Sequence, residues 1–302
     1  MTLAILNISW QTLADALSLG GIYALMAVGI GLVFGVLRLV NFAYGQLIMA
    51  GAYALAYSSV WGWPEWSGIL LCFAVVLALT TAMDWLVFRP LRTHSPAVML
   101  IATFAVAFLL QSIAVLSFGQ LGTIASTVAT LNRPWIISGI AIRKIAPVSI
   151  AIALLCLVLL QLLLTRTSVG LHMRAAAMDF RTARLLGVRA NRVVGGAVFI
   201  SGLLAAVCAV MLTVRNPQVT PIFGLDDTII VLAGVVLGGL NRPLAATLGG
   251  FVIGFGSGIL GGALPTNQSQ YLPTFLFAAV ILVLLIRPNG LFTRADAAGE
   301  RV

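Results

Sequence analysis

The residues best suited to polar chemistry lie in one stretch, residues 165 to 192, which reads TRTSVGLHMRAAAMDFRTARLLGVRANR. Its alanines and leucines, with Gly187 as a stop, predict a short helix. Such a helix can lie on anionic lipid, because arginine is attracted to the negative inner leaflet, or its small residues can fit a groove on another protein. The pattern alone leaves both open. The stretch holds six of the seventeen basic residues of the chain: Arg166, Arg174, Arg181, Arg184, Arg189 and Arg192.

The other polar residues form no catalytic or metal-binding pattern. The histidines, His94 and His172, lie beside arginines, where solvated side chains are expected. The three cysteines lie inside apolar runs, too far apart for a CxxC motif, and we interpret them as packing residues. Asp84 is the one acid well inside an apolar run. Its position shortly before Arg89 favours snorkelling or an ion pair over a proton relay.

The sequence also excludes one source of energy. A P-loop requires the pattern GxxxxGK[ST], because its lysine contacts the nucleotide phosphates. The only lysine is Lys144, in IRKIA. The chain is therefore not expected to be an ATPase of this type, or an enzyme, or to hold a cofactor. The apolar runs also lack the several buried carboxylates expected of most proton-driven carriers. If the chain takes part in active transport, the energy would have to come from another source than these two.

The composition places these residues in a membrane protein. Of 302 residues, 61% are hydrophobic and only 8% are charged, with a mean hydropathy of +1.11. An ordinary soluble domain has about 25% charged residues. The net charge of +9 does not indicate nucleic-acid binding, because the arginines lie between apolar runs and not along a polar face with aromatic platforms.

Apolar runs long enough to cross a bilayer recur along the chain, since a spanning helix needs about 20 such residues. They predict an all-α fold, a polytopic transmembrane helical bundle of eight or nine segments in one domain, residues 1 to 302. The runs lie near residues 12 to 36, 42 to 60, 67 to 88, 97 to 118, 147 to 164, 193 to 213, 243 to 262 and 271 to 286, with a short one at 228 to 240.

The short run is the exception among these segments. As a helix it reaches about 20 Å, against a hydrocarbon core of about 30 Å. Because Asn241, Arg242 and Pro243 follow it, we expect a broken or re-entrant helix in residues 226 to 243. An ordinary crossing with different ends is the alternative. The run at 243 to 262 has glycines at a spacing of four that predict close helix packing on one face: Gly250, Gly254, Gly258 and Gly262.

The loop charges predict how the bundle is oriented. Thirteen basic residues face the cytoplasm if residues 89 to 95, 165 to 192 and 287 to 302 lie there, and four face outward. The N-terminus is then external and the C-terminus cytoplasmic. Arg38 is the first basic residue, so we expect no cleaved signal peptide. The external loop at 119 to 146 could turn a small hairpin at Ser138 and Gly139. It could receive a partner or be a solvated connection.

The segment RAAAMDFRTARLLGV resembles the cytoplasmic coupling loop of permeases in the branched-chain amino-acid family of ABC importers, whose usual form is close to RAxAEDxxxAxLLGI. Met178 departs from this form, because an acidic residue usually stands there. The resemblance implies that residues 165 to 192 form a coupling loop that seats in a groove of an ATPase. The residues expected to couple the two proteins are Arg174, Ala177, Asp179, Arg181, Ala183, Leu185 and Gly187.

Further matches follow in the same order along the chain. GGIYALMAVGIGLVFGVLRLVNFAYGQLIMAGAY at 20 to 53 is similar to the family's GxIYALxAlGlxlvyGvxrliNFAHGexxmlGAY, and VLAGVVLGGLNRPLAATLGGFVIG at 231 to 254 and RPNGLF at 287 to 292 also match. The chain is closer to the LivH-type permease than to its LivM-type companion. Uncharged residues replace the frequent histidine and acid of NFAHGE. This would let a zwitterion or neutral solute pass at a lower desolvation cost, unless the side chains merely cap helix ends. The predicted solute path contains Asn41, Phe42, Tyr44, Gln46 and Asn241.

The resemblance implies a permease subunit of the bacterial inner membrane that translocates branched-chain or other hydrophobic amino acids. Its implied partners are a second, LivM-like permease, two subunits that bind ATP and Mg, a periplasmic substrate-binding protein and membrane lipid. Two alternatives remain at this point. The same scaffold could carry urea, short amides or small aromatic acids, or the chain could form an ATP-independent homo-oligomeric channel.

Overall fold

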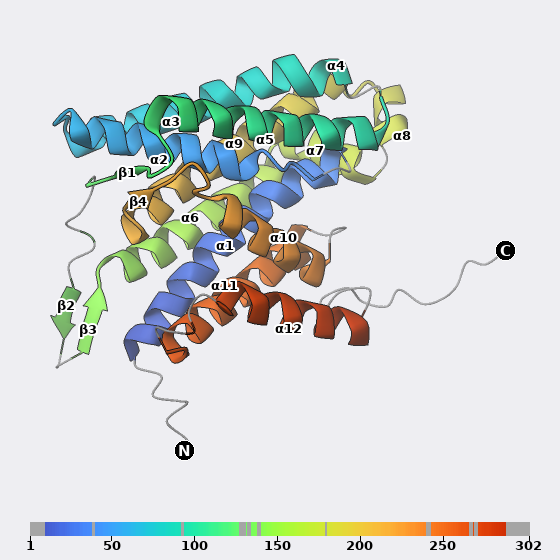
Figure 1. Cartoon of the computed structure of the whole chain (residues 1–302). Coiled ribbons are helices and arrows are strands. Elements are labelled where there is room, and N and C mark those ends of the chain that lie inside the picture. The colour runs from blue at the N-terminus through green and yellow to red at the C-terminus, as the bar shows by residue number, and fades with distance from the viewer. Residues whose placement is uncertain are drawn as a thin grey trace.

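The computed structural model describes residues 10 to 37, 40 to 91, 94 to 126, 131, 134 to 137, 140 to 178, 180 to 239, 243 to 265, 268 and 271 to 287. The fold is a helical bundle (Figure 1). The helices of its first half are α1 (Trp10–Leu37), α2 (Tyr44–Val60), α3 (Glu65–Met83), the π-helical turn η1 (Asp84–Phe88), α4 (Arg89–Leu91) and α5 (Pro96–Phe118). The second half contains α6 (Ile145–Arg166), α7 (Ser168–Met178), α8 (Phe180–Leu185), α9 (Ala190–Arg215), α10 (Leu225–Gly238), α11 (Pro243–Ala263) and α12 (Leu272–Ile286).

Four short strands join the helices at one end of the bundle. β1 (Thr123–Ile124) pairs antiparallel with β4 (Gln218–Val219), which ties the loop after α5 to the loop after α9. β2 (Pro134–Ile137) and β3 (Ile140–Arg143) form an antiparallel hairpin. The predicted hairpin is therefore confirmed, although Ser138 and Gly139 lie outside the described residues.

The transmembrane bundle predicted from the sequence is confirmed. Six helical spans are long and apolar enough to cross a membrane: Trp10–Leu37, Glu65–Leu91, Ala97–Phe118, Ile145–Arg166, Asn191–Arg215 and Leu244–Ala263. α2, α10 and α12 are shorter. α10 has 14 residues and reaches about 21 Å, well below the thickness of a hydrocarbon core. It ends before Gly239, and α11 begins at Pro243.

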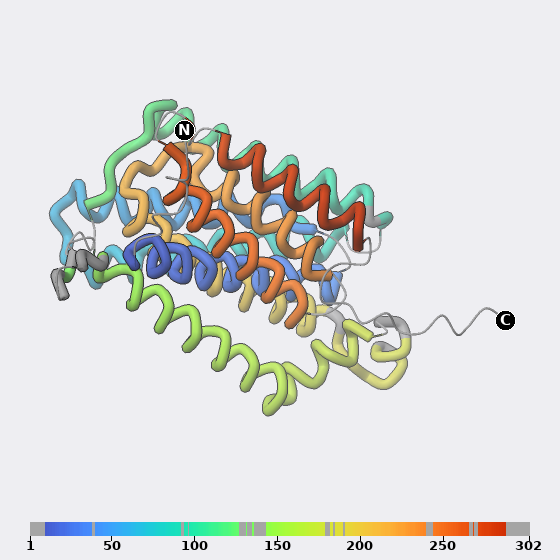
Figure 2. Tube along the Cα trace, turned by 90° about the horizontal axis from the view of Figure 1, so that it is seen from below, coloured from blue at the N-terminus to red at the C-terminus, as the bar shows by residue number. Residues whose placement is uncertain are grey.

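α1 is the central helix, and α11 runs along its length in two perpendicular views (Figures 1 and 2). Its middle part is buried on all sides because α6, α9, α10 and α11 surround it. α2 is also buried along most of its length. By contrast, α5, α6 and α12 expose leucine, isoleucine and phenylalanine side chains. An apolar exterior of this kind is what a bilayer requires.

The glycine face of α11 (Gly250, Gly254, Gly258 and Gly262) lies against α1. A Cβ on Gly254 would lie 2.8 Å from the Leu19 carbonyl oxygen and 2.9 Å from Gly20 Cα. Cβ atoms on the other three would also overlap atoms of α1, since Gly250 faces Ala27, Gly258 faces Ala16 and Gly262 faces Thr12. Glycine lets the two backbones approach closely over several turns, which increases their van der Waals contact.

The two ends of the bundle differ in their residues. The hairpin end carries β2, β3, the beginning of α1 and the end of α9, whereas the arginine-rich end carries α4, α7 and α8 (Figure 1). Near the arginine-rich end, Arg89 Nε donates to Asp84 Oδ2 at 2.9 Å. Asp84 is buried and the pair lies against Gly195 of α9, which confirms the predicted ion pair.

Candidate coupling surface and solute path

The α7–α8 segment folds back directly on the end of α6. The Thr167 hydroxyl donates to the Leu163 carbonyl at 2.6 Å and accepts the Gly170 N–H at 3.1 Å. It thus ends one helix and caps the next. Gly170 packs against the carbonyl oxygens of Leu163 and Leu164, where a side chain would overlap the backbone. The chain therefore turns from α6 into α7 without a flexible linker, and Figure 2 shows both small helices at the end of α6.

The inner face of this segment is fixed to the bundle. Met173, Ala176 and Ala183 are buried. A Cβ on Gly196 of α9 would lie only 2.9 Å from Met173 Cε, so the glycine makes room for this methionine. α7 contacts α1, α6 and α9. A displacement of α7 must therefore move the helices of the central bundle as well.

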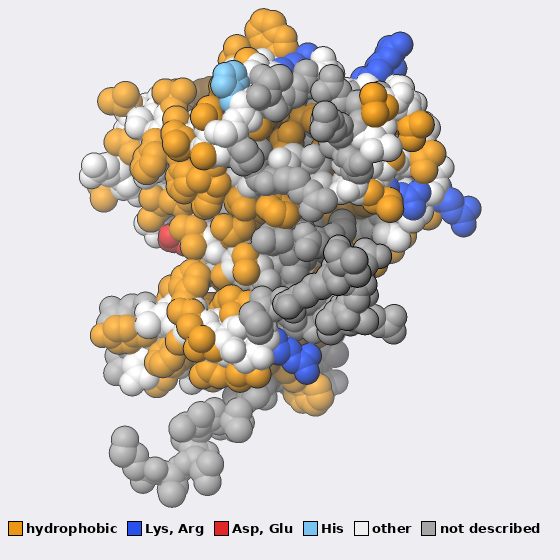
Figure 3. Space-filling view, turned by 90° about the vertical axis from the view of Figure 1, so that its right-hand side faces the viewer, with side chains coloured by type: hydrophobic (Ala, Val, Ile, Leu, Met, Phe, Trp, Pro, Cys, Tyr) orange, Lys and Arg blue, Asp and Glu red, His pale blue; other side chains and the backbone are white. Residues whose placement is uncertain are grey.

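The outer face of the segment is apolar and open. Met178, Leu185 and Leu186 have exposed fractions of 86%, 85% and 81%. Arg189 and Arg192 are exposed beside them and line a cavity of about 370 Å³ together with Ser168, Val169, His172, Gly187 and Val193. We call Met178, Leu185 and Leu186 the docking surface. Seen from this end, blue basic groups project at the edge of the molecule amid orange hydrophobic side chains (Figure 3).

The predicted coupling residues fall on both faces of the segment. Arg174 and Leu185 are exposed, whereas Ala183 is buried in α8, which packs on α7. Gly187 has a φ of +86°, a left-handed conformation that favours glycine, and a Cβ there would meet no described atom within 4 Å. Ala177 is half-buried in α7. Asp179 and the side chain of Arg181 lie outside the described residues.

The predicted solute path begins where α2 starts. Asn41 is buried, and its Oδ1 accepts the Ala43 N–H at 3.1 Å, a local bond that orders the turn into α2. Phe42 stacks on Phe104 of α5, with ring centroids 4.0 Å apart. Asn241 lies outside the described residues.

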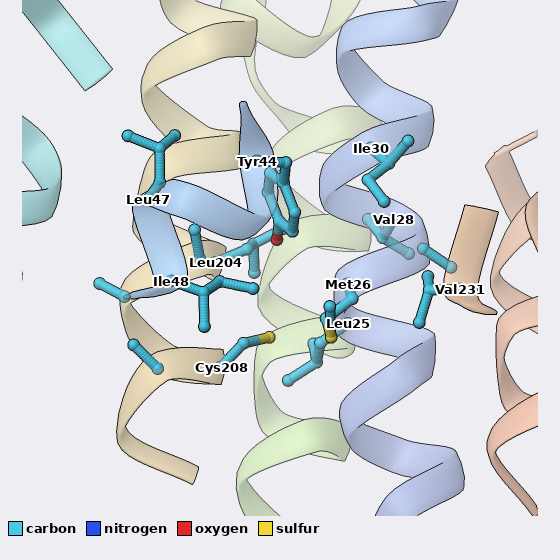
Figure 4. Close-up of a cluster of buried hydrophobic side chains, with 14 of the residues drawn as sticks. Leu25, Met26, Val28, Ile30, Tyr44, Leu47, Ile48, Leu204, Cys208 and Val231 are labelled. Carbon is cyan, nitrogen blue, oxygen red and sulfur yellow. The ribbon is translucent and has the colours of Figure 1, made fainter. Parts of the chain in front are cut away.

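Tyr44 and Gln46 continue from this turn into the buried part of α2. Tyr44 lies between α1 and α9, close to Leu204 and Cys208 (Figure 4). It fits there because its ring and hydroxyl lie against Gly29 of α1, which has no side chain. Gln46 is also buried, and its Oε1 has no hydrogen-bond partner among the described residues. An unpaired buried amide oxygen destabilises this packing and would gain from a solute or water donor.

A cavity of about 450 Å³ at the hairpin end contains charged residues that sequence reasoning missed. Tyr23, halfway along α1, donates to Asp227 Oδ1 at 2.5 Å. Arg215 and Arg143 line the same cavity, as do Leu19, Leu212, Asn216, Gln218, Thr220, Ile222, Phe223, Gly224 and Asp226. A sequence signal existed, because Arg215 follows the apolar run at 193 to 213 and the short run begins after two aspartates. Only the fold brings these charges to one cavity.

Comparison with known proteins identifies relatives over nearly the whole chain. Residues 12 to 286 match the family model described as branched-chain amino acid transport system / permease component. The high-affinity branched-chain amino acid transport permease BraD of Pseudomonas aeruginosa is 29% identical over 302 residues, covering 95% of this chain and 96% of the relative. LivH of Escherichia coli, a permease with the same description, is 26% identical over 300 residues, with the same shares covered.

The fold also resembles a solved structure. A metal-chelate type ABC transporter in an inward-facing conformation superimposes with a TM-score of 0.54 at 20% identity, covering 94% of this chain and 89% of the other. At this identity the likeness shows a shared fold.

Proposed function

Since the chain belongs to the family of permease components of branched-chain amino acid transport systems, we propose that it forms one half of the solute path in an ABC importer for branched-chain or related apolar amino acids. It is a multi-pass membrane protein, and its family implies that other subunits of the transporter use ATP. We propose the bacterial inner membrane as its location. The proposed partners are a second, LivM-like permease, two ATP-binding subunits and a periplasmic substrate-binding protein.

The docking surface is the observation that carries this proposal. Three large apolar side chains are almost fully exposed at the arginine-rich end, on a segment whose inner face is fixed to α6 and α9. Exposed apolar groups with charged neighbours are typical of protein interfaces. An ATPase subunit that binds here would move α7 when it closes on ATP. The bundle would then shift between two packings that open to opposite sides of the membrane.

The proposed orientation follows from the same assignment. The arginine-rich end faces the cytoplasm, where ATP is available, and the hairpin end faces the periplasm. Arginines on the inner side agree with the loop-charge rule. The N-terminus then lies in the periplasm and the C-terminus in the cytoplasm.

We also propose that the start of α2 belongs to the solute path. Asn41, Phe42 and Tyr44 hold the turn and the first residues of the helix in place, while Gln46 carries the buried oxygen that a passing solute could engage. Movement between two packings of α1, α2 and α9 would open this region. Asn241 is retained as a candidate from the sequence alone.

Purification of the assembled transporter tests the function. The chain should co-purify with two P-loop ATPase subunits and a second permease. In proteoliposomes with the binding protein, leucine, isoleucine or valine should stimulate ATP hydrolysis and enter the vesicles. Urea, short amides and small aromatic acids serve as competing substrates.

Each possible result of that assay decides between functions. Stimulation by urea or an aromatic acid, with none by branched-chain amino acids, would assign the scaffold to another solute. Uptake by the chain alone, unchanged when ATP is omitted, would make it a channel. Coupled uptake of leucine supports the importer.

A further inference from the structure

The cavity at the hairpin end holds opposite charges that do not pair with each other. Within the described residues, neither Asp227 nor Arg215 forms an ion pair at 4.0 Å or less. Both side chains line the same cavity, and Arg143 adds a second positive charge. Charged groups within a membrane protein are costly, and they are usually retained for a function. Their separation leaves room for a molecule that carries both signs.

Two of these groups are positioned by contacts with α1. The Tyr23 hydroxyl holds Asp227 Oδ1 at 2.5 Å. Arg215 Nη1 donates to the Asp15 carbonyl oxygen at 3.3 Å, the one hydrogen bond of its five N–H donors within the described residues. The negative charge of Asp15 also acts on Arg215, and the remaining guanidinium donors can serve a carboxylate in the cavity. The position of Asp227 in the first turn of α10 stabilises that helix through its dipole, but this does not explain the arginines.

The cavity also has an apolar wall. Leu19, Leu212 and Phe223 line it next to the charged groups. Its volume of about 450 Å³ lies within the usual range of small-molecule sites. An apolar side chain can lie against this wall while an ammonium and a carboxylate group meet the charges. Tyr23 lies halfway along α1, so the cavity extends from the hairpin end well into the bundle.

We propose that this cavity is a binding site for the zwitterionic head group of an apolar α-amino acid. Asp227 accepts hydrogen bonds from the ammonium group, Arg215 donates to the carboxylate, and Leu19, Leu212 and Phe223 contact the side chain. Tyr23 is a positioning residue for Asp227. This inference rests on the proposed function and adds a solute site in the permease itself, separate from any site in a binding protein.

Labelling of a cysteine in the cavity tests the site without the binding protein. Gln218 lines the cavity and is exposed, so Gln218→Cys should react with a membrane-impermeant maleimide in the purified transporter complex. Cys72 and Cys208 are buried and Cys156 lies within the membrane span of α6, which limits background reaction. Leucine should slow the labelling. Leucinamide, which lacks the carboxylate, and 4-methylpentanoate, which lacks the ammonium, should not.

Asp227→Asn supplies the decisive comparison. Loss of a hydrogen bond to a charged group should raise the leucine concentration for half-protection by about 10- to 100-fold. Protection is measured relative to the labelling rate of each variant without leucine, because loss of the Asp227 charge can itself change the reactivity of the nearby thiol. Glu65→Gln removes the same charge from an exposed position at the same end, outside this cavity, and should leave protection unchanged.

The outcomes separate this site from the wider function. No protection by leucine, equal protection by all three compounds, or equal protection in Asp227→Asn would overturn the site. ATP-driven leucine uptake by the unmodified transporter would still support the importer in that case. Protection that depends on Asp227, without any uptake of amino acids, would instead contradict the importer.

Discussion

Glycine has opposite roles in two regions of this molecule, the glycine face of α11 and the turn at Gly187 after α8. On the glycine face, a Cβ would overlap atoms of α1, so glycine is needed because space is absent. At Gly187 a Cβ would meet no described atom within 4 Å, and glycine is favoured by its positive φ. The first region is built for close permanent packing. The second fixes a turn on an open surface, which fits the proposal that another protein binds there.

The largest effect is expected from Gly254→Leu on the glycine face. The added side chain must displace backbone atoms of α1 at Leu19 and Gly20. Overpacking of a well-filled contact costs about 3 kcal/mol or more when the backbone has to move. We expect little folded subunit, measured as monodisperse protein by gel filtration and as a lowered melting temperature.

Gly256→Leu is the matched control on the same helix. A Cβ at Gly256 meets no described atom within 4 Å, so this variant should yield folded protein close to the wild-type amount. Equal losses in both variants would mean that helix propensity or membrane insertion, and not contact with α1, makes glycine necessary.

Gly187→Leu should separate coupling from folding. The strain of a left-handed residue costs about 1 to 2 kcal/mol, and no clash adds to it. The subunit should therefore fold, but the distorted turn should displace Leu185 and Leu186 from the ATPase. We expect ATP hydrolysis that no longer drives uptake, measured in proteoliposomes as the ratio of solute transported to ATP hydrolysed.

Gly62→Leu also places a side chain at a positive φ at the hairpin end, in the turn between α2 and α3. Gly62 has a φ of +69°, and again a Cβ would meet no described atom within 4 Å. Its transport ratio should remain near that of the wild type. If Gly187→Leu leaves the ratio equally unaffected, the α7–α8 segment does not transmit the movement.

Leu185→Asn combined with Leu186→Asn should weaken binding of the ATPase without unfolding the subunit. Substitutions at exposed positions usually change the free energy of unfolding of the free subunit by no more than about 0.5 kcal/mol. Burying both leucines at an interface is worth about 2 kcal/mol or more, which corresponds to more than tenfold in Kd. The measurement is a titration of the purified permease with its ATPase.

An exposed leucine elsewhere provides the comparison for this pair. Leu121 has an exposed fraction of 91% and lies at the hairpin end, so Leu121→Asn should not change the Kd for the ATPase. A Kd that is unchanged in the double variant as well would assign the docking surface to lipid contact.

The sequence predicted the bundle because apolar runs and glycine spacing are local patterns. The six long spans, the short α10 and the hairpin all lie where the runs and turn residues indicated. The pattern Gly250-x-x-x-Gly254 indicated a close contact, but not that α1 would be the partner. Which helices meet depends on long-range packing, which spacing along one helix does not encode.

The functional regions were predictable to different degrees. Residues 168 to 187 could be proposed as a coupling segment because charge and helix formers are concentrated within one stretch. The cavity with Tyr23, Arg215 and Asp227 was missed because Tyr23 lies 204 residues from Asp227 along the chain. Arg215 and Asp227 each look like an ordinary helix-end residue. For Asn41, the sequence pattern did not distinguish a role in the solute path from a role in capping a helix end. In the structure its buried amide orders the turn into α2.

The smallest effect is expected from Asp84→Asn, because the pair that it changes belongs neither to the glycine face of α11 nor to the turn at Gly187. Arg89 is partly exposed, so its ion pair with Asp84 is screened by solvent and contributes about 1 kcal/mol or less. Arg89 can still donate to the amide oxygen of the variant, and Gly195 of α9 keeps the space around it. We expect a small fall in melting temperature and full ATP-driven uptake. A double-mutant cycle with Arg89→Gln should assign the fall to this pair. Loss of uptake in a stably folded Asp84→Asn variant would instead indicate that the negative charge of Asp84 takes part in transport.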